Sequence, residues 1–286
     1  MDQKYINLFD RFTHGGMSRR EFLEKLSLMA GSSAAAFAIL PVLENNYANA
    51  GVVEATDPRL KVEDITLASG LKGHLAAPAN AAGKLPVVLV IHENRGLNPH
   101  IKDVTRRMAL EGFLAFGADF LTSQGGTPDD ADKARDMIGT LTNEQITTMA
   151  TAARADLAGH SRGNGKVAAI GFCWGGGLVN SLAVADPVLA AGIAYYGRQA
   201  AAAEVPAIKA PLMLHYGALD ERINAGIADF EAALKANSKT YELYVYEGAN
   251  HAFNNDSNAA RYSKEAADLA WSRSVAFIKK NAGGMA

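Results

Sequence analysis

The chain of 286 residues contains a single cysteine, Cys173, which excludes an intrachain disulfide framework and a zinc site built from several cysteines. The chain also lacks an excess of charge of one sign, because 28 Lys and Arg nearly balance 30 Asp and Glu and leave a net charge of -2. No basic cluster is interleaved with aromatic residues, so nothing favours nucleic acid as a partner. What remains, 49% hydrophobic and 20% charged residues, is typical of a globular protein with one sizeable domain.

The first 50 residues differ in kind from the rest. Residues 18–23, which include Arg19 and Arg20, resemble the twin-arginine export signal, and an apolar, alanine-rich stretch follows over 26–43. Residues 48–50, Ala-Asn-Ala, form a small-x-small sequence suited to a signal peptidase. We therefore expect residues 1–50 to be a signal peptide cut after Ala50. Eighteen residues diluted by glycine and serine are short for a permanent membrane anchor, which is the alternative.

Export would take the folded domain, residues 51–286, through the twin-arginine machinery to the periplasm, where the mature form is not embedded in the membrane. An oxidising compartment disfavours spare thiols, so the retention of Cys173 suggests that this thiol is used. A buried structural cysteine would survive there as well.

Strand-like and helix-like segments alternate along the mature chain. Strands are expected at residues 61–68, 72–77, 86–92, 113–117, 166–172, 189–196, 211–217 and 241–246. Helices are expected at 99–111, after Thr127-Pro128, and at 143–159, 177–185, 223–236 and 259–280. This alternation predicts an α/β fold in a single domain, with a mostly parallel central sheet covered by helices on both faces.

Residues 168–177 run from an apolar strand into a cysteine boxed by glycines and then into a helix. In α/β-hydrolases the pattern Gly-x-Ser-x-Gly places the nucleophile on a strained strand-to-helix turn, and here Cys173 occupies that position. The start of the helix favours the thiolate. The alternatives are a buried structural cysteine and a phosphate-binding turn, although neither the Gly-x-Gly-x-x-Gly spacing nor a Walker lysine is present.

Two further residues follow Cys173 in the order that an α/β-hydrolase requires. Asp220 and His251 each come just after a predicted strand, so a Cys173-Asp220-His251 triad is expected. His251 would take the thiol proton and later activate water, while Asp220 orients the imidazole. Glu221 is the rival acid. We expect His92 and His215 to make hydrogen bonds in the core, whereas His74, His100 and His160 should lie on polar surfaces.

Five motifs together resemble the dienelactone hydrolases, also called carboxymethylenebutenolidases, over about residues 60–281. The motifs are Gly-Phe-Cys-Trp-Gly-Gly at 171–176, His-Glu-Asn-Arg-Gly-Leu at 92–97, Tyr-Tyr-Gly at 195–197, Leu-Asp at 219–220 and Asn-His-Ala-Phe at 250–253. The resemblance implies an α/β-hydrolase fold without metal or organic cofactor, which cleaves small ester or lactone substrates through a cysteine thiolate.

The resemblance also implies roles for three residues around the nucleophile. Glu93 matches a glutamate that contacts the resting cysteine and is displaced by substrate, which switches the thiolate on. The backbone N–H groups of Asn94 and Trp174 match the oxyanion hole. The alternative for Glu93 is a surface or helix-capping carboxylate.

One position departs from the family. Asn255 stands four residues beyond the predicted catalytic histidine, where the family has an arginine that holds the substrate carboxylate. Arg95, Arg198 or Arg222 would supply the cation instead, or each is a solvated loop residue. We therefore expect an ester or lactone other than the ring-cleavage dienelactone. The competing hypothesis is an exported binding protein with this fold and no turnover.

Overall fold

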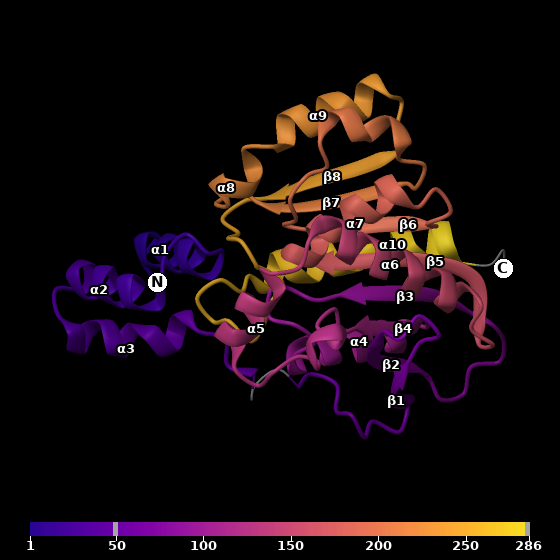
Figure 1. The fold of residues 1–286 in the computed structure, drawn as a ribbon, viewed down its shortest axis with the longest axis horizontal. Coiled ribbons are helices and arrows are strands. Elements are labelled where there is room, and N and C mark those ends of the chain that lie inside the picture. The colour runs from indigo at the N-terminus through magenta and orange to yellow at the C-terminus, as the bar shows by residue number, and fades with distance from the viewer. Residues whose placement is uncertain (48–50, 284–286) are drawn as a thin grey trace.

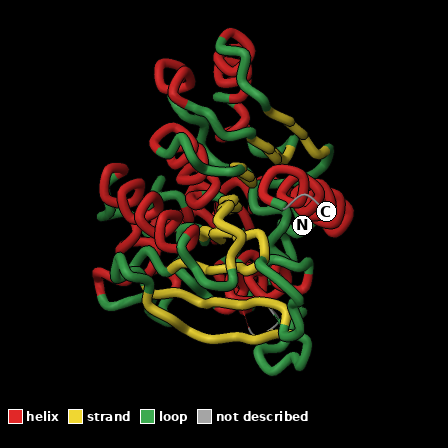
Figure 2. Tube along the Cα trace, turned by 90° about the vertical axis from the view of Figure 1, so that its right-hand side faces the viewer, coloured by secondary structure: helices red, strands yellow, loops and turns green. Residues whose placement is uncertain are grey.

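The computed structural model describes residues 1–47 and 51–283. Eight strands form one sheet in the order β1-β2-β4-β3-β5-β6-β7-β8. β2 pairs antiparallel with β1 and β4, and all other neighbours are parallel (Figures 1 and 2). The strands are β1 (Leu60–Thr66), β2 (Lys72–Pro78), β3 (Leu85–Ile91), β4 (Leu114–Ala118), β5 (Gly163–Phe172), β6 (Ala191–Tyr195), β7 (Leu212–Gly217) and β8 (Tyr241–Tyr246).

Helices cover both faces of this sheet, as the alternation of elements predicts. In β3, Val87, Leu89 and Ile91 face α6 and α7, whereas Val88 and Val90 face α4 and α10. Such continuous apolar strands belong in a parallel sheet that is buried on both sides. The helices of this domain are α4 (Pro99–Leu110), α5 (Ala131–Ile138), α6 (Asn143–Ala158), α7 (Trp174–Ala185), α8 (Glu221–Asn224), α9 (Ile227–Ala236) and α10 (Lys264–Ala282), with 3-10 turns η2 (Thr122–Gln124) and η3 (Ala202–Ala207).

Three helix predictions are wrong in detail, one of them because the helix expected over 259–280 begins only at Lys264. The helix expected after Thr127-Pro128 begins later, because Asp130 caps α5 by accepting hydrogen bonds from the backbone N–H groups of Asp132 and Lys133. The single helix expected over 223–236 is broken into α8 and α9 around Gly226, the N-cap of α9. The break leaves Asp220 at the start of its own short helix, beside the sheet edge that carries the predicted triad.

Two histidines expected on polar surfaces are buried. His74 is 5% exposed and contacts Asp64, while His100 is 1% exposed and lies 3.1 Å from Asp256. Asp64 hydrogen-bonds Nδ1 of His74, and the Asp256 carboxylate lies beside the His100 ring, so each imidazole has an acidic neighbour that the sequence pattern does not reveal. His160 is partly exposed.

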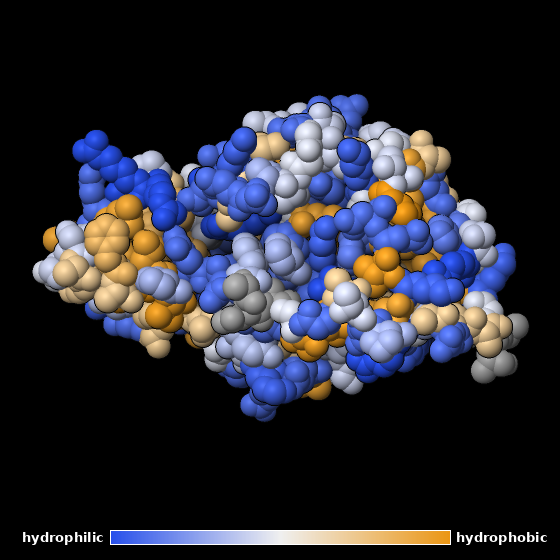
Figure 3. Space-filling view, turned by 90° about the horizontal axis from the view of Figure 1, so that it is seen from below, coloured by the Kyte–Doolittle hydropathy of each residue, from blue (hydrophilic) through white to orange (hydrophobic). Residues whose placement is uncertain are grey.

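Residues 1–47 fold into three helices, α1 (Gln3–Thr13), α2 (Arg19–Ala30) and α3 (Ser33–Leu43). They lie beyond the carboxyl ends of the parallel strands, as a separate group in Figure 1. Their buried apolar side chains form a cluster of their own, which only Ala260 joins from elsewhere in the described chain. Apolar side chains also gather on their outer surface in Figure 3, where Leu28 and Phe37 are 83% and 63% exposed.

The hypothesis of a cleaved signal peptide stays a prediction, and Ala48-Asn49-Ala50 lies outside the described residues. Among the described residues, no single helix is long and apolar enough to cross a membrane. The pair α2 and α3 has the length and composition for a span but is bent by 113°.

Candidate active site

Cys173 sits on a sharp turn between β5 and α7. Its φ of 56° and ψ of -112° place a non-glycine residue in a backbone conformation that L side chains rarely adopt. The flanking glycines leave no room for side chains, because a Cβ on Gly171 would lie 2.1 Å from the Gly175 carbonyl oxygen, and one on Gly175 would lie 2.4 Å from that of His92. The predicted nucleophile elbow is therefore present in the backbone geometry.

Asp220 and His251 come together at the same edge of the sheet. The Nδ1 of His251 lies 2.5 Å from Oδ2 of Asp220, and both residues are buried. Burial disfavours the charged forms, but the attraction between the two groups prevails, so the pKa of Asp220 is lowered and that of His251 is raised well above its ordinary value. Glu221, the rival acid, is exposed on α8.

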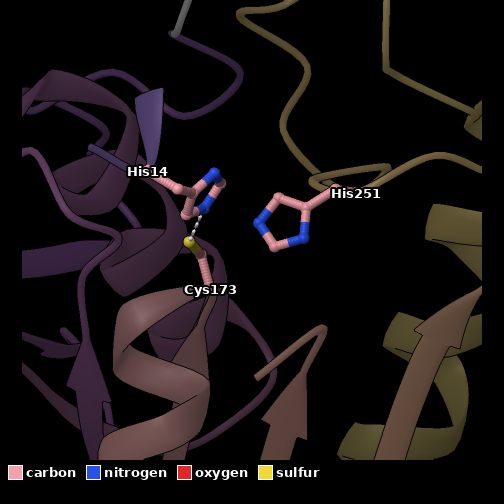
Figure 4. Close-up of side chains that lie close together, drawn as sticks. All are labelled: His14, Cys173 and His251. Atoms are coloured by element: carbon pink, nitrogen blue, oxygen red, sulfur yellow. Dashed lines mark hydrogen bonds between the residues drawn. The ribbon is translucent and has the colours of Figure 1, made fainter. Parts of the chain in front are cut away.

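A second imidazole, which the sequence analysis missed, reaches the nucleophile. His14 ends α1, and its Nε2 lies 3.3 Å from Sγ of Cys173 (Figure 4). The His14 and His251 rings meet edge to face, with centroids 4.8 Å apart. His251 Nε2 points toward the same space but makes no hydrogen bond among the described residues. No local pattern reveals a contact between residues 159 positions apart in the chain.

The two histidines determine the charge state of the thiol. Burial alone raises the pKa of Cys173, but the positive charges of His251 and His14 outweigh it and lower the pKa to about 6. At neutral pH the sulfur is therefore mostly thiolate, paired with imidazolium. A thiolate is the reactive form of cysteine, so this charge state suits the nucleophile role predicted for Cys173.

A cavity of about 560 Å³ opens beside the sulfur. The residues that line it include Cys173 and His251 together with Asn94, Trp174, Arg198 and Arg222. The N-terminal segment supplies part of the wall through Thr13, His14 and Gly15. Of the three arginines expected to bind substrate, Arg198 and Arg222 thus line this cavity, whereas Arg95 is not among its lining residues and lies 3.6 Å from Asp132.

The neighbouring residues hold the rim of this cavity in place. The Trp174 ring stacks on His92 at 5.2 Å, and the side chain of Asn94 donates a hydrogen bond to the Thr13 carbonyl.

His92 is fully buried with Nδ1 2.6 Å from the Glu93 carbonyl oxygen, and His215 contacts Tyr246 and Ser274. The expectation that these two histidines make core hydrogen bonds is confirmed.

Comparison with known proteins identifies the family. A sequence model described as "Dienelactone hydrolase family" matches residues 71–282, which is most of the chain. The chain belongs to the dienelactone hydrolase family. Residues 1–31 match a second model, described as "YqhI-like".

The relatives of this dienelactone hydrolase family member cover different shares of its chain. It is 33% identical to the "Putative carboxymethylenebutenolidase" of Saccharolobus solfataricus over 248 residues, which cover 73% of this chain and 94% of the relative. A "Putative hydrolase fragment YghX" of Escherichia coli is 47% identical over 107 residues, covering 36% and 92% of the two chains. The crystal structure of a "Putative Dienelactone Hydrolase" from Klebsiella pneumoniae superposes with a TM-score of 0.71 at 29% identity, covering 77% and 99%.

The surroundings of Glu93 in this dienelactone hydrolase family member differ from what the sequence resemblance implies. Glu93 is 5% exposed, and its Oε2 accepts a hydrogen bond of 2.7 Å from Asn255, the residue for which the resemblance implies an arginine. Its Oε1 is buried without a hydrogen-bond partner among the described residues. No hydrogen bond joins Glu93 to Cys173 in that part of the chain, where His14 contacts the sulfur instead. The switch role of Glu93 stays a prediction.

Proposed function

We propose that this protein hydrolyses small carboxylic esters or lactones, with Cys173 as nucleophile, His251 as acid and base, and Asp220 as the residue that orients His251. The observation that carries the proposal is the elbow at Cys173, whose strained backbone presents a thiol with a pKa of about 6 to the cavity. A strained backbone conformation persists only where the surrounding structure enforces it, and such residues cluster at functional sites. The strain at Cys173 therefore favours a catalytic role over a binding protein without turnover.

In the proposed reaction the Cys173 thiolate attacks the carbonyl carbon and forms a tetrahedral intermediate. The leaving alcohol departs with a proton from His251, and a thioester remains on the sulfur. His251 then takes a proton from water, which attacks the thioester and releases the carboxylic acid. A lactone gives one product, a hydroxy acid, because its alcohol and acid belong to the same molecule.

The backbone N–H groups of Asn94 and Trp174 are proposed to stabilise the oxyanion, since Trp174 is the first residue of α7 and Asn94 follows β3 at the cavity rim. Arg198 and Arg222 favour substrates that carry an anionic group, such as a carboxylate. Glu93 is proposed to act on the resting thiolate through charge rather than by a direct hydrogen bond.

The test is hydrolysis of p-nitrophenyl acetate and of small lactones, with and without a carboxylate, by the reduced full-length chain in the presence of a chelator. Cys173→Ala should remove the activity, and Asp220→Asn should lower kcat by roughly 10⁴ if the carboxylate orients His251 as in serine hydrolases. Glu221→Gln is the matched control and should retain activity. Full activity in Cys173→Ala would refute the thiolate mechanism.

We also propose export to the periplasm by the twin-arginine route. Its support is the motif at residues 18–23 followed by the apolar stretch 26–43. The double variant Arg19→Lys, Arg20→Lys should leave the protein in the cytoplasm of the producing cell, as fractionation would show. Unchanged secretion would contradict the proposal.

A further inference from the structure

The space around the Cys173 sulfur brings together three groups that bind transition metals. Nε2 of His14, Sγ of Cys173 and Nε2 of His251 all lie within 4.8 Å of one another (Figure 4). They come from three distant parts of the chain: the end of α1, the elbow, and the loop after β8. The sequence excludes a site built from several cysteines but not this mixed set.

The hydrogen bonds of the two rings place Nε2 of each toward the sulfur, and this atom offers a lone pair once the ring gives up its proton. Nδ1 of His14 lies 2.7 Å from the Asp10 carbonyl oxygen, which can only accept, so Nδ1 carries the hydrogen. Nδ1 of His251 donates in the same way to the Asp220 carboxylate. In each neutral ring the unprotonated nitrogen is therefore Nε2, the atom that faces Cys173.

Metal-binding histidines typically have this support, in which the ring nitrogen away from the metal donates to a carboxylate or a backbone carbonyl. Asp10 adds a carboxylate oxygen 3.2 Å from Nδ1 of His14, so an acidic residue stands behind each ring. The buried Nε2 of His251 has no hydrogen-bond partner among the described residues, which leaves one polar atom at the centre unsatisfied.

We propose that His14, Cys173 and His251 bind a divalent zinc ion, with the fourth position open to the cavity. One thiolate and two imidazoles suit zinc, and bond lengths of about 2.3 Å to sulfur and 2.0 Å to nitrogen put tetrahedral ligand atoms about 3.5 Å apart. The 3.3 Å between His14 Nε2 and the sulfur is close to that spacing.

The bound ion takes the place of the protons between the rings and the sulfur. It occupies the nucleophile and the general base together, so zinc and ester hydrolysis compete for Cys173. Because one ligand belongs to α1, the ion also links the N-terminal segment to the catalytic domain. The site shares two residues with the proposed triad, but its formation requires no turnover and is measured without substrate.

The first experiment titrates the reduced, chelator-stripped full-length chain with Co²⁺ and follows the absorption of thiolate-to-cobalt charge transfer. One Co²⁺ per chain should bind with tetrahedral spectral features, and Zn²⁺ should displace it. His14→Gln should weaken Zn²⁺ binding at least about 10-fold, the lower end of what the loss of a mere supporting contact costs. His160→Gln is the matched control, because His160 is partly exposed at the opposite end of β5 and should leave the affinity unchanged.

X-ray absorption on the zinc-loaded wild-type chain identifies the ligands without any variant, should His14→Gln fold poorly. One sulfur and two imidazoles are expected. Absence of the charge-transfer band, equal Zn²⁺ affinity in wild type and folded His14→Gln, or a ligand set with a single imidazole would each overturn the proposal. Failure of the hydrolase proposal looks different, since the chelated wild-type chain would then show no ester hydrolysis that depends on Cys173.

Discussion

Two glycines of α7 should respond in opposite directions to the same substitution. A Cβ on Gly175 would lie 2.4 Å from the His92 carbonyl oxygen and 2.5 Å from that of Ile91. Both contacts are with backbone, which has no rotamer to change, and fall about 1 Å short of ordinary van der Waals distance. α7 and the end of β3 would therefore have to separate, which costs about 1–3 kcal/mol or more.

Gly177, two residues along the same helix, has room for the methyl group. Its Cβ would first meet Arg198 at 3.5 Å, which is ordinary van der Waals contact. Since alanine is the better helix former, Gly177→Ala should stabilise the protein by about 0.5–1 kcal/mol. At about 2–4 °C per kcal/mol for a domain of this size, Tm should rise by roughly 1–4 °C, whereas Gly175→Ala should lower Tm by at least about 2 °C.

Thermal unfolding of the two variants beside the wild type, followed by ester hydrolysis, checks this reasoning. Gly175→Ala should also lower kcat by about 100-fold, because a shift of about 1 Å at the elbow misplaces the sulfur relative to His251. Gly177→Ala should leave kcat close to that of the wild type. If Gly175→Ala matches the wild type in Tm and kcat, or if both variants lose stability equally, the account of the elbow is wrong.

Other predictions concern the charges around the site. The rate at which iodoacetamide alkylates Cys173, measured with a chelator present, should increase with pH through a midpoint near 6. The reason is that the lowered pKa of Cys173 preserves the thiolate down to that pH. A midpoint near 9 would contradict the pairing of the sulfur with His251 and His14. In His14→Gln the midpoint should move upward, since one positive charge beside the sulfur is lost; the midpoint is the readout because the rate itself also changes with access. Asn255→Ala should destabilise the fold by about 1–3 kcal/mol or more, because it removes the hydrogen bond to the buried Glu93 carboxylate and the two that Ser257 donates to Asn255 Oδ1. Adding Glu93→Gln should recover part of the lost Tm, and a further loss in the double variant would show that the carboxylate needs no partner.

The catalytic domain was largely predictable because its signals are local. The run of β-branched residues over 86–92 marks a strand buried on both faces, and β3 occupies that place. The glycines around Cys173 could only serve a turn in which chain segments touch, and the backbone of that turn is strained as expected. That Cys173, Asp220 and His251 lie close together was likewise predictable, since each follows a strand whose end lies at one edge of the sheet. Their role as a triad stays a prediction.

The unpredicted features depend on contacts between distant segments. Asn255 marks a departure from the family pattern in the sequence, but only the fold shows that its amide holds Glu93. The amphipathic pattern of the sequence continues across Gly226, so periodicity alone favours one helix there and does not predict the break. His14 belongs to a segment whose twin-arginine motif and apolar stretch are typical of a leader. That interpretation gives no reason to expect a contact between His14 and Cys173, 159 positions away in the sequence.

The contacts between residues 1–47 and the domain are compatible with two interpretations of this segment: a leader that is later removed, and a segment that docks beside Cys173. Its apolar side chains pack mainly on one another, and its links to the domain are mostly polar: Arg19 to Asp132, Asp10 to Arg222, and Thr13 to Asn94. Exposed ion pairs contribute little net stability, and a polar interface can separate without exposing a shared core. The segment can therefore dock beside Cys173 in the full-length chain and still detach as a unit, as the proposed export would require. The contact that would give docking a measurable effect is that of His14 with Cys173, because it lowers the pKa of the thiol.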